Sequence, residues 1–592
     1  MIITNLTNWT YKEELEGLLF FAQRFLELSY DKTDYSEKRL PTLPLDIINE
    51  CLQYIKLEES GLFNVSDAEL GLLFTELVNC IKENKTAKKI LGDKKEYYLS
   101  KIKLDNDRKT IKNILIVIGM KFKNKEYFNL LQDDLKECIV NYKKKDNLYE
   151  TTTALYQYLL FRGYQKATIY YLTNTFFFDR LGKKKITKIN DIERFLSLFN
   201  MKIEKFDVVF SASKLFRLIE DSCKKFKIEI DLNKESLSYD NIENYFYKNK
   251  KDKKLFITCK DIRAVDYQHA MRKAKEKISL LLGLFVVFSH RNKPWISDYC
   301  LVYKHDKCNV VKINKQGNAM HSLGENDYSY TKEMFPIFIS RFGLESESFQ
   351  RFNRCIELHS LALDTDELAS QIVNLWICLE TLLITNKTNS HIKKVIENVC
   401  LINFSYAIRN RLTSLVDLLK KWNKEEFEKI KEKIKITDDN EAIAALVGVE
   451  KFKDITSDLL SKLNEQPLLR YKIFLMIKEI QTKGGIKKFL EKETEKCKRD
   501  INRVYRARNK IVHLGNLDGH NDYLVETIHH YLDLVLYAII ERRVKFNDIL
   551  TIDNLIQEMQ INVECHKNFL SGNNNEKLNE GNFISLIFGP DN

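Results

Sequence analysis

The sequence predicts a mainly α-helical protein with a small mixed α/β region in its middle. Long stretches near both ends place apolar residues at helical spacing, as in Tyr11–Tyr30. Between these stretches, short runs rich in β-branched and aromatic residues are typical of strands. At 592 residues, several domains are expected rather than one core. We therefore expect a helical N-terminal region over 1–165, a mixed α/β region over 166–335, an all-α helical bundle over 336–565 and a flexible tail over 566–592.

The helices and strands of the first two regions are predicted from the spacing of apolar residues and from residues that commonly end a helix. In the N-terminal region we expect helices over Tyr11–Tyr30, Asp67–Glu83 and Asn147–Arg162. Gly163 stands where a glycine commonly ends a helix. In the middle region the predicted strands are Ala167–Leu172, Phe206–Phe210, Leu255–Cys259 and a hairpin of Tyr299–Tyr303 with Val310–Ile313. A long helix is predicted over Asp266–Phe288, between the third of these strands and the hairpin.

The C-terminal half returns to helical periodicity. The predicted helices are Asp366–Ile384, Ser390–Cys400, Tyr406–Trp422, Tyr471–Gln481, Ile486–Val504 and Tyr523–Arg543. Residues 424–465 are charged and follow the pattern less closely. Residues 571–582 have the composition of a flexible linker, and the apolar run Phe583–Gly589 after them can dock on another surface.

Composition narrows the class of protein. The chain is 44% hydrophobic and 30% charged, as is ordinary for a soluble globular protein. Its net charge of +12 favours a polyanionic partner such as nucleic acid, although a composition rich in Lys, Asn and Ile also follows from AT-rich codons. The N-terminus lacks the pattern of a signal peptide, and the longest apolar run, Ile278–Phe288, is too short to span a bilayer and is interpreted as core.

The sequence contains no recognisable motif for binding a metal ion or a nucleotide. Twelve cysteines are scattered without a C-x-x-C pair or zinc-site spacing, which is typical of reduced thiols in a cytosolic protein. The P-loop and G-x-G-x-x-G patterns are absent. His529 and His530 are adjacent on a predicted helix, so they point to different faces and cannot form a simple two-ligand site. We therefore expect a cytoplasmic protein with no metal, no cofactor and no membrane contact.

The most informative stretch is Arg508–His513. It contains an arginine and a histidine with four residues between them, and Asn509 follows the arginine. A histidine transfers protons near neutral pH, and a guanidinium holds a phosphate through two parallel hydrogen bonds. The spacing alone is weak, because Arg354 and His359 share it. The amide at 509 and the long helices on either side distinguish the later match.

Helical geometry leaves the choice of arginine open. If the segment is helical, Asn509 and His513 share a face, and Arg506 lies two turns before His513 on nearly that face. Arg508 lies off to the side, so Arg506 is a rival for holding a phosphate. In a purely structural interpretation this is a basic helix end: His513 interacts favourably with the helix dipole and the arginines are solvated.

Residues of about 340–560 resemble a HEPN domain, in particular the Apea-like HEPN group of bacterial phage-defence proteins. The resemblance lies in the R-N-x-x-x-H block at Arg508, Asn509 and His513, and in an upstream aromatic-rich helix that carries Trp376 and Glu380. The central run from Leu255 to Phe288 also looks like the α/β region that often precedes such domains. The charged insert at 424–465 departs from the compact family pattern.

The resemblance implies a metal-independent endoribonuclease that acts as a homodimer in abortive-infection defence. His513 would act as acid and base, Arg508 would neutralise the phosphoryl oxygens, and Asn509 would orient the histidine or bind the phosphate. Further phosphates would be held by Arg503, Arg506 and Lys510. Glu380 would orient Arg508, or would simply be a helix glutamate at the solvent edge. Residues 1–335 would sense a trigger from the phage or restrain the nuclease.

Two other functions remain open from the sequence. The chain can be a non-catalytic RNA-binding or scaffold protein that keeps the helical fold without turnover. It can also be a nuclease subunit whose partner protein supplies the specificity.

Overall fold

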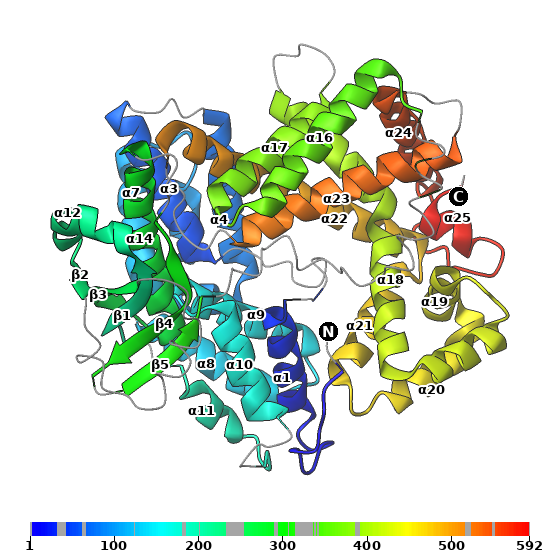
Figure 1. The fold of residues 1–592 in the computed structure, drawn as a ribbon. Coiled ribbons are helices and arrows are strands. Elements are labelled where there is room, and N and C mark those ends of the chain that lie inside the picture. Colours follow the sequence, from blue (N-terminus) through cyan, green and yellow to red (C-terminus); the bar gives the residue numbers. More distant parts are fainter. Residues whose placement is uncertain are drawn as a thin grey trace. The chain divides into compact units, whose positions relative to one another are not determined.

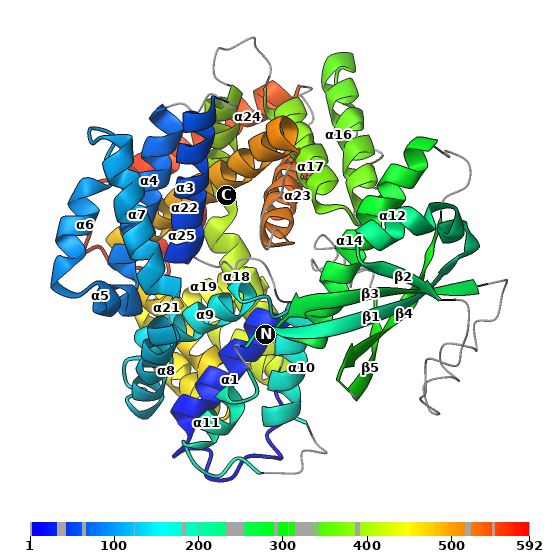
Figure 2. The same ribbon diagram turned by 90° about the vertical axis from the view of Figure 1, so that its left-hand side faces the viewer.

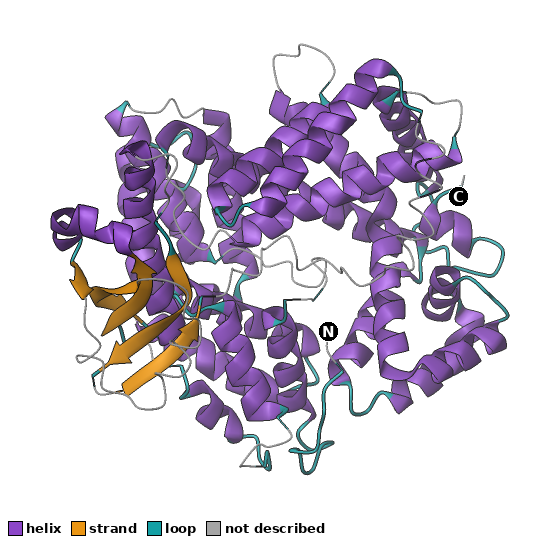
Figure 3. Ribbon diagram, in the orientation of Figure 1, coloured by secondary structure: helices purple, strands orange, loops and turns teal. Residues whose placement is uncertain are grey.

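A computed structural model confirms a mainly α-helical protein with one small sheet (Figures 1 and 3). The structure describes residues 3–31, 33, 43–61, 67–123, 125–179, 185–199, 202–231, 254–288, 294–305, 307–313, 336, 339, 343–384, 391–515, 522–546 and 551–590. The chain forms two compact units. The first contains residues 1–157, 177–189 and 318–592, and the second contains residues 158–176 and 190–317. The N-terminal helices therefore belong to the same unit as the C-terminal helices.

The N-terminal part of the first unit is helical, as expected. Its helices are α1 (Glu16–Ser29), α3 (Pro44–Ser60), α4 (Asp67–Glu83), α5 (Lys85–Leu91), α6 (Lys95–Lys101), α7 (Arg108–Lys123), α8 (Lys125–Val140) and α9 (Lys145–Phe161). Helix α1 packs against α8 and also against α21 (Pro467–Ile480) from the C-terminal half. It is buried nearly all round, and Leu18, Phe20 and Phe21 are fully buried. Helix α9 ends before Gly163, whose φ of +103° confirms the predicted glycine cap.

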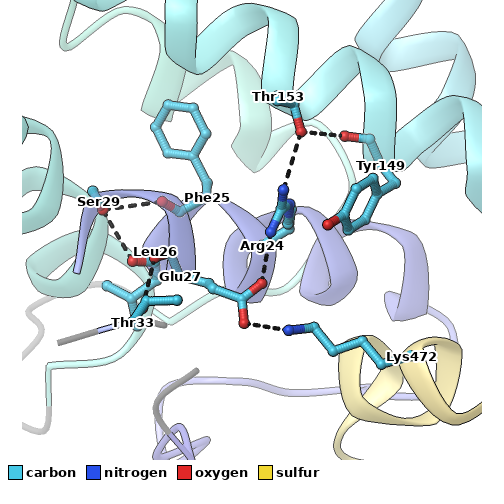
Figure 4. Close-up of polar contacts among 9 residues, drawn as sticks. All are labelled: Arg24, Phe25, Leu26, Glu27, Ser29, Thr33, Tyr149, Thr153 and Lys472. Carbon is cyan, nitrogen blue, oxygen red and sulfur yellow. Dashed lines mark hydrogen bonds and ion pairs between the residues drawn. The ribbon is translucent and has the colours of Figure 1, made fainter. Parts of the chain in front are cut away.

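A buried charged triad joins α1, α9 and α21 (Figure 4). Glu27 accepts hydrogen bonds from Arg24 Nη1 at 2.8 Å and from Lys472 Nζ at 2.6 Å. All three side chains are 1% exposed or less. The Arg24 guanidinium also lies 3.9 Å from the centre of the Tyr149 ring, and its Nη2 donates to Thr153 Oγ1. Charges this deeply buried are tolerated because each is paired, so the triad fixes the N-terminal helices to the C-terminal half.

The C-terminal half of the first unit is built around a helical bundle. Its helices are α16 (Ser346–Asp364), α17 (Leu368–Leu383), α18 (His391–Ile434), α22 (Lys483–Leu514), α23 (Asp522–Lys545) and α24 (Ile552–Phe569). Helix α17 packs against α16, α22 and α23, and α18 packs against α22. Their core includes Trp376, Val504 and Tyr531, each with no exposed surface. This arrangement positions the predicted site, because α22 carries Arg508, Asn509 and His513.

Helix α18 replaces two of the predicted helices. We expected Ser390–Cys400 and Tyr406–Trp422 to be separate, but one helical stretch runs through both as far as Trp422, and a second stretch follows to Ile434. The break falls later, at Asn423, where φ is −160° and ψ is 98°. There the Asn423 side-chain oxygen accepts a hydrogen bond from the N–H of Glu426, as a helix cap does.

The charged insert and the tail are also ordered. Residues 424–465 form the end of α18 followed by α19 (Asp439–Gly448) and α20 (Lys453–Lys462). The prediction of a flexible tail over 566–592 is wrong for the described residues, whereas the docking of its apolar run is confirmed. Helix α25 (Phe583–Phe588) packs against α18, α19 and α22 and buries Phe583, Leu586 and Ile587. The preceding linker pairs with the start of α22, since the N–H groups of Lys483 and Gly484 donate to backbone carbonyls of Glu576 and Asn574.

The second unit contains an antiparallel five-stranded sheet of order β2-β3-β1-β4-β5 (Figure 2). Its strands are β1 (Glu204–Ser213), β2 (Ile228–Asp231), β3 (Lys254–Ala264), β4 (Ile296–Lys304) and β5 (Lys307–Lys312). Its helices are α10 (Lys166–Phe177), α11 (Asp191–Leu196), α12 (Glu220–Lys225) and α14 (Tyr267–Phe288), of which α14 covers one face of the sheet. The hairpin of β4 and β5 is confirmed. The long apolar run in α14 is core on one side only, because Leu280, Leu284 and Val287 are exposed.

Helix α10 contradicts a predicted strand. We expected Ala167–Leu172 to be extended because the run is rich in β-branched and aromatic residues, yet it is the start of a helix. Ile169, Thr173 and Phe177 are each fully buried, whereas Tyr171, which a strand would place on the same face, is 67% exposed, as a helix requires. Burial of that face therefore overrode the weak strand propensity of the individual residues.

Candidate functional site at the end of α22

One continuous helix carries the predicted catalytic residues. Helix α22 begins after Thr482, whose hydroxyl accepts a hydrogen bond from the N–H of Gly485, and ends at Gly515, where φ is +61°. Arg508, Asn509 and His513 lie in its last two turns. In a regular helix Asn509 and His513 share a face, whereas Arg508 and His513 point about 140° apart. In this helix Arg506 lies nearly on the face of His513, so Arg506 and Arg508 are both candidates for holding the phosphate.

The three residues differ in their surroundings. His513 is exposed, Arg508 is half-buried and Asn509 is 5% exposed. Arg508 Nη1 donates a hydrogen bond to Asn509 Oδ1 at 3.2 Å. Asn509 Nδ2 in turn lies 3.5 Å from Glu69 Oε1 on α4. The structure therefore brings Arg508 and Asn509 together and leaves the imidazole of His513 accessible to solvent.

Glu380, the predicted orienting residue, is not brought to Arg508. It is half-buried on α17, and no hydrogen bond or ion pair joins it to Arg508 within the described part of the chain. Arg508 is oriented by its neighbour Asn509 instead. The expectation that Glu380 positions Arg508 is therefore not supported by any contact.

The basic face of α22 is paired with carboxylates from α3 and α4. Arg506 Nε lies 3.0 Å from Glu50 Oε1, and Arg506 Nη2 lies 2.9 Å from Glu76 Oε2. Arg503 Nε donates to the other oxygen of Glu76, and Lys510 Nζ lies 3.6 Å from Glu50 Oε1. Arg506 is 4% exposed and Glu76 is 7% exposed. The three residues predicted to hold phosphates thus hold carboxylate groups, in pairs that are largely shielded from water.

The charges of this cluster stabilise one another. Burial alone would raise the pKa of Glu50, but Arg506 and Lys510 outweigh it and lower that pKa to about 2. Burial likewise opposes the effect of Arg503 and Arg506 on Glu76, whose pKa is nevertheless lowered. Glu50 and Glu76 therefore remain ionised at neutral pH and bind the arginines as fixed anions.

Asp46 is the exception in this cluster. It lies in the first turn of α3, where burial and the nearby charge of Glu50 raise the pKa of Asp46 to about 7, while Arg503 acts in the opposite sense. The acidic surface that faces α22 therefore contains one carboxyl group that exchanges its proton near neutral pH.

Sequence reasoning did not find these acidic partners. Glu50 and Arg506 are 456 positions apart, and Glu76 and Arg506 are 430 apart. No spacing rule relates residues at such separations, and both glutamates lie in ordinary amphipathic helices. The only signal in the sequence was the density of arginine and lysine along α22, which predicts an anionic partner without naming it.

A second cluster of polar side chains lies between α16 and α23. His359 Nε2 and His529 Nε2 are 2.9 Å apart, and their rings are parallel to within 5°. Asp533 Oδ1 lies 3.4 Å from His529 Nε2 and 4.0 Å from His359 Nε2. Burial lowers the pKa of His359 and raises the pKa of Asp533 to about 7. This grouping was not predicted from the sequence, because His359 and His529 are 170 positions apart.

No family model matches the chain, and comparisons with curated proteins and with solved structures find no match. None of the twelve cysteines forms a disulfide bond in the structure. Over the described ranges, every helix is too short or too polar to cross a bilayer. Conclusions about function therefore depend on the residues of the site.

Proposed function

We propose that this chain is a HEPN-like, metal-independent endoribonuclease of bacterial anti-phage defence that acts as a homodimer. The observation that carries the proposal is the placement of Arg508, Asn509 and His513 in the last two turns of α22, with His513 exposed. This helix packs with α17, α18 and α23 in a bundle whose core includes Trp376. An exposed proton-transfer group, a guanidinium and an amide are the set of groups that RNA cleavage without a metal requires.

The chemistry uses the nucleophile that RNA itself contains. The imidazole of His513 removes the proton of a ribose 2′-hydroxyl, and that oxygen attacks the adjacent phosphorus. The bond from phosphorus to the 5′-oxygen breaks, and the leaving oxygen takes up a proton from the second imidazole of the dimer or from water. The products are a 2′,3′-cyclic phosphate and a 5′-hydroxyl. DNA lacks the 2′-hydroxyl and should resist cleavage.

Arg508 is the better candidate for holding the reacting phosphate. Arg506 is nearly buried and is paired with two glutamates, so it would have to break both ion pairs to bind RNA. Arg508 is half-buried, and among the described residues its recorded side-chain hydrogen bond is the one to Asn509. These surroundings favour Arg508 as the catalytic cation and give Arg506 a role in binding the acidic face.

Helices α3 and α4 supply a means of restraint. The carboxylates of Glu50 and Glu76 form ion pairs with the guanidinium groups of Arg503 and Arg506. These are the groups that we predict to bind neighbouring RNA phosphates. A carboxylate and a phosphate oxygen accept the same charge-assisted hydrogen bonds, so one excludes the other. We infer that a trigger, such as a phage component, displaces α3 and α4 and frees Arg503, Arg506 and Lys510 for RNA.

The catalytic proposal is tested with purified chain and a fluorescent RNA in the presence of EDTA. His513→Ala should lower the cleavage rate by about 10²-fold or more, since general acid–base catalysis contributes about 10²–10⁴-fold. His530→Ala is the control, because it removes a half-buried histidine of α23 that lies outside the motif. Equal cleavage by the wild type and His513→Ala would rule out this histidine as the catalytic group.

The restraint is tested by removing its negative charges. The double variant Glu50→Gln with Glu76→Gln should cleave RNA faster than the wild type and slow cell growth, and adding His513→Ala should abolish both effects. Glu59→Gln is the matched control, since Glu59 lies on α3 but pairs with Lys112 in an exposed ion pair. If the double variant is no more active than Glu59→Gln, the glutamates do not restrain a nuclease.

One observation favours the alternative of a non-catalytic RNA-binding protein. Arg508 and His513 point about 140° apart on a regular helix, so a single chain does not direct both at one phosphate. In a homodimer the two groups can come from different protomers. Sedimentation of the double variant with and without RNA separates these possibilities: a dimer that cleaves supports the nuclease, and RNA binding without cleavage supports the alternative.

A further inference from the structure

We propose that His359, His529 and Asp533 bind a divalent transition-metal ion of the Zn²⁺ type. The site joins α16 to α23, and it goes beyond the proposed nuclease because it uses none of the residues of the α22 motif. Its function is to hold the two helices together, whereas RNA cleavage is proposed to proceed without a metal.

Two helices supply the three ligand atoms. His529 and Asp533 are four residues apart on α23, so they lie on one face of that helix. Helix α16 places His359 against the same face, with the two Nε2 atoms 2.9 Å apart. The backbone beneath each ligand is fixed by core residues, since Leu358 is 4% exposed and Leu532 is fully buried. The three groups are therefore held on packed helices rather than on loops.

The distances among the three atoms match a metal-binding geometry. His359 Nε2, His529 Nε2 and Asp533 Oδ1 form a triangle with sides of 2.9, 3.4 and 4.0 Å. A point about 2.0 Å from all three atoms exists near the centre of such a triangle, and Zn²⁺ bonds to imidazole nitrogen and carboxylate oxygen at about 2.0–2.2 Å. A tetrahedral ion would hold these atoms about 3.3 Å apart, so the separation of His359 and Asp533 would have to shorten by roughly 0.7 Å on coordination.

Without an ion, the two imidazoles share a hydrogen bond between their Nε2 atoms. One Nε2 then carries a proton and the other accepts it. Binding of the ion requires that this proton move to Nδ1 of the same ring, so that both Nε2 lone pairs face the metal. The ion thus replaces one shared proton, and small rotations of the rings turn both lone pairs toward the ion.

The donor set selects the kind of ion. Two imidazole nitrogens and one carboxylate oxygen suit Zn²⁺, Co²⁺ and Ni²⁺, whereas Mg²⁺ and Ca²⁺ require mostly oxygen ligands. The Asp533 side chain is 39% exposed, which leaves one side open for entry and for a water as the fourth ligand. His529 is 6% exposed, so the nitrogen side of the site is enclosed.

The test uses the full chain after treatment with a chelator and dialysis. Co²⁺ should produce the visible absorption of a nitrogen- and oxygen-ligated ion, and calorimetry with Zn²⁺ should show one site per chain. Asp533→Asn and His359→Gln should each weaken binding of Zn²⁺ by about 10-fold or more, as expected for loss of one of three ligands. His530→Gln removes the neighbouring histidine and should bind Zn²⁺ like the wild type. Mg²⁺ should not compete.

A second measurement separates ligand loss from unfolding. Zn²⁺ should raise the Tm of the wild type and of His530→Gln by more than it raises the Tm of Asp533→Asn, which keeps the size of the side chain and lies at the open edge of the site. Absence of Co²⁺ absorption in the wild type, or equal Zn²⁺ affinity in the wild type and Asp533→Asn, would overturn the site. Because binding is measured without RNA, either result is independent of whether the chain is a nuclease.

Discussion

Arg506 and Arg508 are separated by one residue on α22, yet their surroundings assign them different tasks. Arg506 is enclosed by Glu50 and Glu76, and a guanidinium with two carboxylate partners is a fixed structural charge. Arg508 points to another side of the helix and bonds only to its neighbouring amide among the contacts described here. The difference arises from the 100° turn per residue of the helix, which directs two similar side chains to different environments.

The two arginines should respond differently to truncation. Arg506→Ala leaves Glu50 and Glu76 without their shared partner, so it should lower the free energy of unfolding by about 3 kcal/mol or more. Arg508→Ala should change it by about 1 kcal/mol or less. In the background of Glu50→Gln and Glu76→Gln, Arg508→Ala should lower RNA cleavage by about 10²-fold, as loss of a charge-stabilising donor does. Urea denaturation and cleavage rates measure the two effects, and a larger loss of cleavage in Arg506→Ala would reverse the assignment.

Asp46 makes stability depend on pH in a defined direction. Its pKa is raised to about 7 in the folded protein, above its ordinary value of 3.8, so folding favours the protonated form. The unfolded chain releases this proton first, and stability is therefore lost as pH rises from about 4 to about 7. Asp46→Asn should raise the Tm at pH 8 and have little effect near pH 4.5. The exposed Asp105→Asn is the control, and an equal shift at both pH values would contradict the assignment.

Among the secondary-structure elements, the C-terminal tail is ordered by its contacts with the rest of the first unit, although its sequence resembles a flexible linker. Residues 571–582 have a linker composition, yet they are held by backbone hydrogen bonds to the start of α22. Close packing also requires glycine at Gly484, because a Cβ there would lie 2.7 Å from the backbone oxygen of Asn574. The short helix α25 is thereby placed against α19, and its apolar residues complete the core of the charged insert.

Truncation of a residue in α25 should therefore destabilise the first unit. Leu586→Ala removes a side chain that is 1% exposed and should lower the free energy of unfolding by about 2–5 kcal/mol, the range for buried leucines. Ile561→Ala on α24 removes a side chain that is 56% exposed and should cost about 0.5 kcal/mol or less. Thermal and urea denaturation compare the two, and similar small losses would mean that α25 is not docked in solution.

In the molecule as a whole, the first unit is stabilised by buried ion pairs between its N-terminal helices and helices of the C-terminal half. Glu27 and Lys472 are 445 positions apart, and their ion pair is enclosed by α1 and α21. The same unit contains the ion pairs of Glu50 and Glu76 with α22. The N-terminal helices are therefore part of the fold that contains the candidate nuclease site, and they place the acidic groups on its basic face.

Glu27→Gln tests this coupling. Removal of the charge leaves Arg24 and Lys472 buried without their anionic partner and should cost about 3–5 kcal/mol of unfolding free energy. Glu465→Gln is the control, because Glu465 pairs with Lys12 in an exposed ion pair and should matter by less than about 1 kcal/mol. The measurement is urea denaturation followed by circular dichroism. A small loss for Glu27→Gln would show that the triad does not hold the N-terminal helices in place.

Apolar periodicity and cap residues act within a few turns, so the sequence was enough to predict the helical class, the helices α4, α9, α14 and α17 and the β4–β5 hairpin. The helix that leads to Arg508, Asn509 and His513 was predicted to end at Val504, but it continues to Leu514. The sequence did not determine the helical state of α10, the continuity of α18 or the docking of the tail, since each depends on which face finally packs. The partners of the basic face and the meeting of His359 with His529 were decided only by the tertiary structure. The physical reason is distance along the chain: electrostatic pairing and coordination geometry require atoms within a few ångströms, and only packing brings residues hundreds of positions apart that close.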